Sequence, residues 1–349
     1  MKSVSLKQRI EWVDVVKYIC MMCIIMSHLE ASTMVMYRFW SPFYLMGFFF
    51  VSGYVYKNKY NFKQFIENKA KTLLWPWLFF SVGNILIAQV VSFNQHEPIL
   101  KELIWNFLQI RTLGDGAWFL AAIFIAFIPF YYVVCNYENR KSKQSRIFLA
   151  GLLITLSVIS SIYVRIMPPE MLPWNNVNLP WHGEYIFQAV LFMYLGYLFR
   201  EKYEEKFDRI NNPLVAVCLL ILYIIIVYAF PEAYTTKNLF YYIFHIYIRR
   251  IVGVMMIVSI SKLIKSNAYT RFVGQNTLLY FVLQGKIYSF IQALLRRTVG
   301  EWYSMVLGNL VYSSIFDFVG GFIMSFVLII PVYIINTYFP ILIGKQRKK

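Results

Sequence analysis

The chain has 349 residues, of which 59% are hydrophobic and 15% are charged, and its formal net charge is +17. Soluble domains carry roughly 45–50% apolar and about 25% charged residues, so this composition excludes an ordinary soluble fold. A bilayer can cover the surplus apolar surface, and the many Phe, Tyr and Trp residues suit helix packing in lipid and the interfacial belt.

The positive charge does not indicate a nucleic-acid partner, because such a partner requires basic residues gathered on a soluble face. Here lysine and arginine occur in short runs between apolar segments, which is the pattern of membrane topology. Cys20 and Cys23 lie inside an apolar segment with no further thiol nearby, so we interpret them as core residues and expect no metal site. The first apolar run carries Asp14 and Lys17 and has no small-residue cleavage site, so it is not a signal peptide.

Ten segments are candidates for the roughly 20 apolar residues of a spanning helix. In chain order they are 13–35, 42–56, 72–93, 117–135, 147–164, 183–199, 213–231, 240–261, 272–295 and 305–338. The second is short, and the last contains a Gly320–Gly321 pair that favours a kink or tilt. Between the third and fourth, Ile99–Ile110 is interrupted by Lys101 and Glu102 and predicts an interfacial helix.

The charges of the loops between these segments predict the orientation. Alternate loops hold 23 of the 34 lysines and arginines, whereas the opposite loops hold 7. Missing one helix would destroy that alternation. The sequence therefore predicts an all-α polytopic membrane protein with about ten transmembrane helices and both termini in the cytoplasm. We expect a single domain over residues 1–349 with no separate soluble domain.

The first helix carries the densest set of ionisable residues, Asp14, Lys17 and His28. An ionisable group inside a bilayer is costly, so each is a candidate for function. Lys17 and His28 are eleven residues apart, which places them on one helical face about 16 Å apart. Asp14 and Lys17 have the i, i+3 spacing of an ion pair. Imidazole suits proton transfer near neutral pH. The alternative is a snorkelling Asp–Lys pair and a core histidine.

Other polar residues fall at similar estimated depths on the second, eighth, ninth and tenth helices, and one shared cavity would explain them. They are Ser52, His245, Arg249, Arg250, Gln284, Lys286 and Asp317. Adjacent Arg249 and Arg250 point about 100° apart, so we expect only one to face the cavity. Asp317 is either a counter-ion for one of these cations or a substrate contact.

Five short motifs follow one another along the chain. The first is Arg9-Ile-Glu-Trp-Val-Asp14-Val-Val-Lys17 running on to Met26-Ser27-His28. The others are Phe48-Phe49-Phe50-Val51-Ser52-Gly53-Tyr54, the stretch from Lys69 to Leu73-Leu74-Trp75-Pro76, Trp118-Phe119-Leu120 and Phe272-Val273-Gly274-Gln275-Asn276-Thr277. Each is weak alone, but in this order, over nearly the whole chain, they resemble the acyltransferase-3 family of membrane acyltransferases.

Two positions depart from the family pattern. Lys17 stands where the family often has Arg, a variant of the fucose-O-acetylase-like branch, and Gln284 stands where many members have a histidine. The resemblance therefore leaves His28 as the main base candidate.

The resemblance implies a bacterial cell-membrane enzyme that moves an acyl group, usually acetyl, from cytoplasmic acyl-CoA to a sugar hydroxyl. The acceptor would be a cell-surface glycan or its lipid-linked precursor, and acetyl-CoA would be the donor with no metal. His28 would act as base or as transient acyl carrier. Asp14 and Lys17 would organise the CoA side, where lysine binds phosphate as a point charge.

Further roles follow for the remaining candidates. Ser52, Arg249 and Lys286 would bind the donor together with Lys17, and Trp118, Trp181, Gln284 and Asp317 would contact the acceptor. The Pro168–Glu184 loop, with Trp174, His182 and Glu184, suits sugar stacking and hydrogen bonding, or equally an interfacial aromatic belt. Membrane lipid is a further expected partner. A transporter or flippase of a glycan or lipid-linked substrate is the alternative, although no repeat symmetry is visible.

Overall fold

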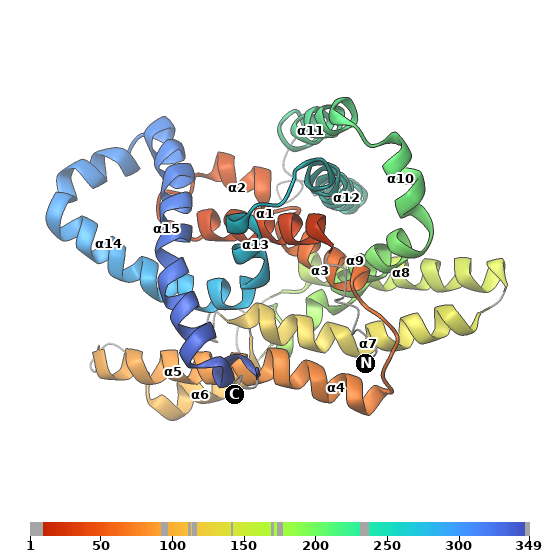
Figure 1. The fold of residues 1–349 in the computed structure, drawn as a ribbon, viewed down its shortest axis with the longest axis horizontal. Coiled ribbons are helices and arrows are strands. Elements are labelled where there is room, and N and C mark those ends of the chain that lie inside the picture. Colours follow the sequence, from red (N-terminus) through yellow and green to blue (C-terminus); the bar gives the residue numbers. More distant parts are fainter. Residues whose placement is uncertain are drawn as a thin grey trace, which may run out of the picture. The chain divides into compact units, whose positions relative to one another are not determined.

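The computed structural model describes residues 10–91, 97–110, 113, 117–140, 142–168, 171–172, 177–230 and 237–345. Within these ranges every regular element is a helix, which confirms the all-α fold class (Figure 1). The chain forms two compact units. The first comprises Met1–Val51, Lys202–Thr236 and Phe244–Ile329, and the second comprises Ser52–Glu201, Lys237–Ile243 and Ile330–Lys349. The expectation of a single domain stays a prediction.

The first unit is built around α1 (Glu11–Ser27), whose Val16, Cys20 and Met21 are completely buried. Its other helices are α2 (Met34–Trp40), α3 (Tyr44–Tyr54), α10 (Glu204–Ile210), α11 (Pro213–Tyr228), α12 (Leu239–Leu263), α13 (Ala268–Gln275), α14 (Thr277–Leu307) and α15 (Leu310–Tyr338). Most but not all residues of α3, α12 and α15 belong to this unit.

Glycines let three helices approach α1 closely. A Cβ on Gly47 of α3 would collide with the Cys20 side chain, and one on Gly321 of α15 would collide with Met26. A Cβ on Gly274 of α13 would overlap the backbone of Asp14. Since helices can approach this closely only where side chains are absent, these positions fix α1 at the centre of the unit.

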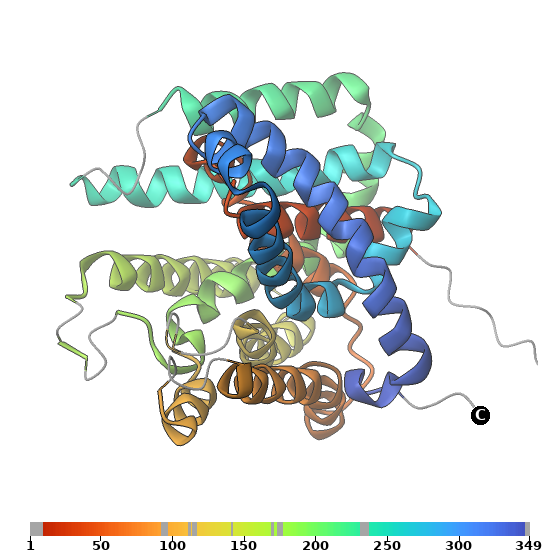
Figure 2. The same cartoon turned by 90° about the vertical axis from the view of Figure 1, so that its left-hand side faces the viewer.

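Helices α11 and α12 lie side by side in both views of the ribbon (Figures 1 and 2). The Ser259 hydroxyl donates a 2.5 Å hydrogen bond to the Asn211 amide oxygen near one end of the pair. Near the other end the His245 Nε2 atom lies 3.0 Å from the Ile226 carbonyl oxygen. Polar contacts between buried faces are typical of helices packed in a membrane.

The second unit contains a three-helix layer in which α9 (Ile186–Leu198) packs against both α7 (Trp118–Asn139) and α8 (Lys143–Ile166). A Cβ on Gly53 would overlap the backbone of Met193 in α9, so the Ser52-Gly53 motif serves a close helix contact. The remaining elements include α4 (Phe62–Lys69), the π-helical turn η1 (Ala70–Leu74), α5 (Trp75–Val91), α6 (Ile99–Leu108), and the 3-10 turns η3 (Pro180–Tyr185) and η6 (Pro340–Ile343).

Six helical stretches in the described part are long and apolar enough to cross a membrane, and a bent helix pair would raise the number to seven. The six are Phe62–Val90, Trp118–Asn139, Lys143–Ile166, Leu239–Leu263, Thr277–Leu307 and Leu310–Tyr338. A multi-pass membrane protein is therefore confirmed, but a count of about ten is not supported. The difference arises because α1, α3, α9 and α11 have only 17, 11, 13 and 16 residues.

One further predicted boundary and one predicted loop are wrong, whereas one predicted helix is confirmed. The first predicted span, 13–35, is wrong at its end, because α1 stops at Ser27 and α2 begins after Thr33, whose hydroxyl caps the Met36 N–H. The predicted interfacial segment is confirmed as helix α6, although its place in the membrane stays a prediction. The predicted loop at Arg296 and Arg297 is helical, since α14 continues to Leu307 with a bend at Val299.

Candidate functional site

His28 is the C-cap of α1 rather than a mid-helix residue, and its side chain is exposed. Its Nδ1 atom lies 2.7 Å from the carbonyl oxygen of Ile24, which also accepts the Ser27 hydroxyl at 2.8 Å. A carbonyl oxygen only accepts hydrogen bonds, so Nδ1 is the nitrogen that carries the proton. In the neutral imidazole the lone pair then lies on Nε2 of an exposed side chain, where it can accept a proton.

The segment that follows His28 is attached to α14 by a cluster of hydrogen bonds around Glu30. The Glu30 carboxylate accepts hydrogen bonds from Arg296, Gln292 and Tyr303, all on α14. The Glu30 N–H donates to the Tyr288 hydroxyl at 2.5 Å. Because these contacts join the connection between α1 and α2 to α14, they hold the backbone two residues after His28. We call Glu30, Tyr288, Gln292, Arg296 and Tyr303 the Glu30 clamp.

Helix α15 holds the same connection from another side. The Ser313 hydroxyl donates a 2.8 Å hydrogen bond to the Ala31 carbonyl, and the Thr33 and Ser314 hydroxyls lie 3.1 Å apart. Glu30 was not a candidate in the sequence analysis. Its position two residues after His28 was the available signal, but its partners are more than 250 positions away along the chain.

We expect Glu30→Ala to slow the reaction that the resemblance implies about 10- to 100-fold if His28 is its base, because loss of the clamp lets the His28 backbone move and small misplacements of a reacting group are costly. The KM should change little, since Glu30 would act through the position of His28. Steady-state kinetics of the purified protein measures both constants. Arg297→Ala is the matched control, because Arg297 is the exposed neighbour of Arg296.

A charge exchange between Glu30 and Arg296 tests the positioning role of the Glu30 clamp more strictly. Exchange of the charges in the double variant Glu30→Arg/Arg296→Glu should restore part of the turnover that either single change removes, since the ion pair is re-formed. Full activity of Glu30→Ala, or an equal loss in Arg297→Ala, would contradict the positioning role.

Asp14 lies in the first turn of α1, at the opposite end from His28, and Lys17 lies about one turn further along the helix. Asp14 is 4% exposed, and its backbone touches Gly274 of α13, whereas Lys17 is half-buried. The Gly274-Gln275-Asn276-Thr277 motif thus joins α13 to α14 directly against Asp14. Asn276 caps α13 and donates a 2.8 Å hydrogen bond to the Phe272 carbonyl. The expected pairing of Asp14 with Lys17 stays a prediction.

Asp317 of α15 is completely buried, and the Ser32 hydroxyl faces its carboxylate without reaching hydrogen-bond geometry. Cys23 is a second neighbour, and Cys23 and Ser32 flank His28 in the sequence. A buried carboxylate that meets only a hydroxyl at this range is costly, so Asp317 is a group that a substrate could satisfy.

The other candidates of the first unit differ in exposure. Gln284 on α14 is 4% exposed, and its amide oxygen has no hydrogen-bond partner among the described atoms. Its near neighbour Lys286 is exposed. Arg249 and Arg250 are both buried, and Arg250 lies over the Tyr247 ring at 5.8 Å. Seven predicted site residues therefore share the helices around α1: Asp14, Lys17, His28, Arg249, Gln284, Lys286 and Asp317.

The remaining three, Ser52, Trp118 and Trp181, belong to the second unit. Ser52 is half-buried near the end of α3. Trp118 begins α7, and its ring centroid lies 4.7 Å from that of His182. Trp181 lies 5.4 Å from Trp77, measured between ring centroids. Trp118 and Trp181 thus belong to one aromatic cluster with Trp77 and His182.

This cluster encloses a buried histidine and glutamate. His182 Nδ1 and Glu184 Oε1 are 3.6 Å apart, and neither ring nitrogen has a hydrogen-bond partner in the described structure. The other Glu184 oxygen accepts the Leu179 N–H at 2.8 Å. Trp181 and His182 both adopt left-handed backbone conformations, with φ of 56° and 53°. Such strain persists only where the surroundings fix it, and it is common at binding sites. Trp174 lies outside the described residues.

The residues that the structure describes contain no group of three or more His, Cys, Asp or Glu side chains that could hold a metal ion. No curated protein and no solved structure matches the chain. A family model does match: Acyl_transf_3, described as an acyltransferase domain, covers residues 10–334. That range runs from the residue before α1 into α15 and includes His28, Asp317 and the aromatic cluster. The chain therefore belongs to the acyltransferase-3 family of membrane acyltransferases.

Proposed function

We propose that the protein is an O-acyltransferase that moves an acetyl group from cytoplasmic acetyl-CoA to a hydroxyl of a cell-surface glycan or its lipid-linked precursor. The observation that carries the proposal is the contact of the His28 ring, whose Nδ1 lies 2.7 Å from the Ile24 carbonyl oxygen on an exposed side chain. A carbonyl can only accept, so in the neutral imidazole this contact assigns the proton to Nδ1 and leaves the Nε2 lone pair to act as base. Acyl transfer to a hydroxyl needs a base so placed.

In the proposed reaction, Nε2 of His28 removes the proton of the acceptor hydroxyl as its oxygen attacks the thioester carbonyl. The carbon–sulfur bond then breaks, and the CoA thiolate leaves with the proton returned from the imidazolium. The products are the acetyl ester and the free CoA thiol. A variant of this route has Nε2 attack the thioester itself, so that the acetyl group rests on His28 before it reaches the hydroxyl.

The other candidates receive supporting roles. We propose that Lys17, with Arg249 and Lys286 of the same unit, contacts the donor, and that Asp14 orients Lys17. The role of Ser52 as a donor contact stays a prediction. Asp317 and Gln284 would take hydrogen bonds from the acceptor, because both carry buried oxygens without a described partner. Trp118 and Trp181 offer aromatic faces, and His182 and Glu184 offer polar atoms, of the kinds that sugar binding uses.

The activity is tested with the purified full-length protein and acetyl-CoA. Release of the CoA thiol, followed with a thiol reagent, should rise when a polysaccharide extract from the source cells is added as acceptor. Mass spectrometry should show a gain of one acetyl group on the glycan. Absence of thiol release with and without acceptor, from protein that remains folded, would contradict the proposal and favour a transporter.

We further propose a bacterial cell membrane location with both termini in the cytoplasm. The basic residues at the two ends of the sequence support this orientation: Lys2, Lys7 and Arg9 precede the first apolar segment, and Lys345, Arg347, Lys348 and Lys349 follow the last. A cysteine introduced at Asn176, which lies outside the described residues, should react with an impermeant maleimide in intact cells. A cysteine introduced at Lys59 should react only after permeabilisation. The reverse pattern, or labelling at both sites in intact cells, would contradict this topology.

A further inference from the structure

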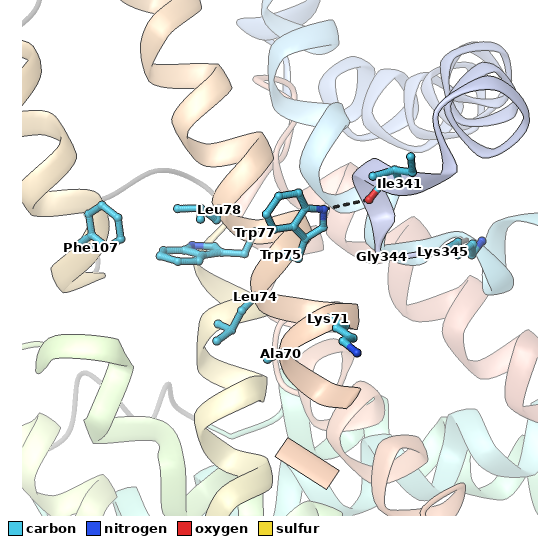
Figure 3. A pocket seen from close by; sticks show the side chains of 10 residues that line it. All are labelled: Ala70, Lys71, Leu74, Trp75, Trp77, Leu78, Phe107, Ile341, Gly344 and Lys345. Atoms are coloured by element: carbon cyan, nitrogen blue, oxygen red, sulfur yellow. Dashed lines mark hydrogen bonds between the residues drawn. The ribbon is translucent and has the colours of Figure 1, made fainter. Parts of the chain in front are cut away.

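A groove of about 820 Å³ lies in the second unit, between α5, α6, the π-helical turn η1 and the C-terminal turn η6 (Figure 3). Its aromatic and aliphatic wall includes Leu74, Trp75, Trp77, Leu78 and Phe107. Figure 3 shows Lys71 and Lys345 on the side of the C-terminal segment and Phe107 on the opposite side. None of the candidate site residues lines it. We propose that this groove binds one anionic phospholipid, with its phosphate between the two lysines and an acyl chain along the aromatic wall.

The groove has a fixed wall. Gly344 has a φ of 67°, in the left-handed region, and a Cβ there would overlap the carbonyl of Lys71. The Trp75 indole N–H donates a 2.9 Å hydrogen bond to the Ile341 carbonyl. Together these contacts hold η6 against the start of α5. The turn η1 that carries Lys71 is π-helical, a geometry that frequently marks functional sites.

The two lysines of the groove, Lys71 and Lys345, have no acidic counter-ion in the described part of the chain. Within the ranges that the structure describes, no carboxylate lies at ion-pair distance from Lys71 or Lys345. The Lys345 ammonium donates a 2.9 Å hydrogen bond to the neutral Asn336 amide oxygen. Burial without a counter-ion lowers the pKa of Lys345. Three of the four residues after Lys345 are also basic. A lipid phosphate would supply the missing negative charge.

The apolar wall distinguishes a phospholipid from a nucleotide donor. Helix α5 belongs to the candidate span Phe62–Val90, so the wall formed by Trp77 and Leu78 lies along a stretch suited to hydrocarbon. An acyl chain covers such a surface favourably, whereas the ribose and adenine of CoA would lose their hydration there. A zwitterionic lipid would bring its own cation toward two lysines. An anionic headgroup is therefore the better complement.

The test uses the full-length protein purified in a neutral detergent and incubated with phosphatidylglycerol or phosphatidylcholine. Native mass spectrometry should show one retained phosphatidylglycerol and little phosphatidylcholine. The double variant Lys71→Gln/Lys345→Gln should retain phosphatidylglycerol roughly 10- to 30-fold less, since each lysine near a headgroup gives roughly a five-fold preference. Lys63→Gln, on an exposed lysine of α4 outside the groove, is the matched control and should behave as wild type.

A second variant tests the apolar wall. Leu74→Trp fills the groove without removing charge, and it should lower retention of the lipid while circular dichroism stays unchanged. Equal retention of the two lipids, or unchanged retention in the double lysine variant, would overturn the proposal. Displacement of the phosphatidylglycerol by an equimolar amount of CoA would overturn it as well, because the groove would then belong to the donor. The experiment needs no turnover, so it is independent of the proposed function.

Discussion

Replacement of His28 by Gln should lower acyl transfer about 10²- to 10⁴-fold, the usual loss when a positioned base is removed. Gln preserves a side-chain amide that can donate to the Ile24 carbonyl, but it has no group that titrates near neutral pH. His28 is exposed and caps the end of α1, so the substitution leaves no buried cavity and the fold should persist. Thiol release from acetyl-CoA in the presence of acceptor measures the effect at matched expression.

The same variant separates the two routes through His28. If the imidazole carries the acetyl group, wild-type protein mixed with acetyl-CoA alone and quenched rapidly should show an acetyl adduct on the peptide that contains His28. If it acts only as base, no adduct forms although transfer remains fast. His28→Gln retaining more than a modest fraction of wild-type transfer would return His28 to a structural role under either route.

Gly274→Ala should destabilise the protein by about 1–3 kcal/mol and impair acyl transfer, because the added Cβ overlaps the backbone of Asp14. Backbone cannot rotate aside as a flexible side chain can, so α13 must move away from α1. Thermal unfolding followed by tryptophan fluorescence measures the stability, and thiol release measures the activity.

Gly151→Ala is the matched control for that change. Gly151 lies inside α8 and has no atom within 4 Å of its would-be Cβ, so alanine there should be neutral or stabilising by roughly 0.5–1 kcal/mol. Equal stability of the two variants would show that α13 is not pressed against Asp14, and the packing of α1 would need to be revised.

The helices that surround α1 could not be predicted from the sequence, because α1 packs against α3, α13 and α15 through Gly47, Gly274 and Gly321. Hydropathy could not reveal these contacts, because a glycine that faces a neighbouring helix has the same hydropathy as any other glycine. The expected gathering of polar residues in one shared cavity stays a prediction. The resemblance to the family, in contrast, rested on short motifs in order and is confirmed by the match over residues 10–334.

The errors have identifiable causes. The first span was drawn through His28 because the apolar run continues to Val35, although Thr33 already stands as the cap of a new helix. The count of about ten included segments whose helices are shorter than a full span, such as the 11 residues of α3. The Glu30 clamp was missed because only the folded chain brings Arg296 to Glu30.

The left-handed Gly344 has a practical consequence for handling the protein. Gly344 rests on the Lys71 carbonyl, and an affinity tag fused directly after Lys349 would begin five residues beyond that turn. A bulky or acidic tag at that place would strain η6 and bring foreign charge near Lys71 and Lys345. A long neutral linker between Lys349 and the tag would avoid both effects.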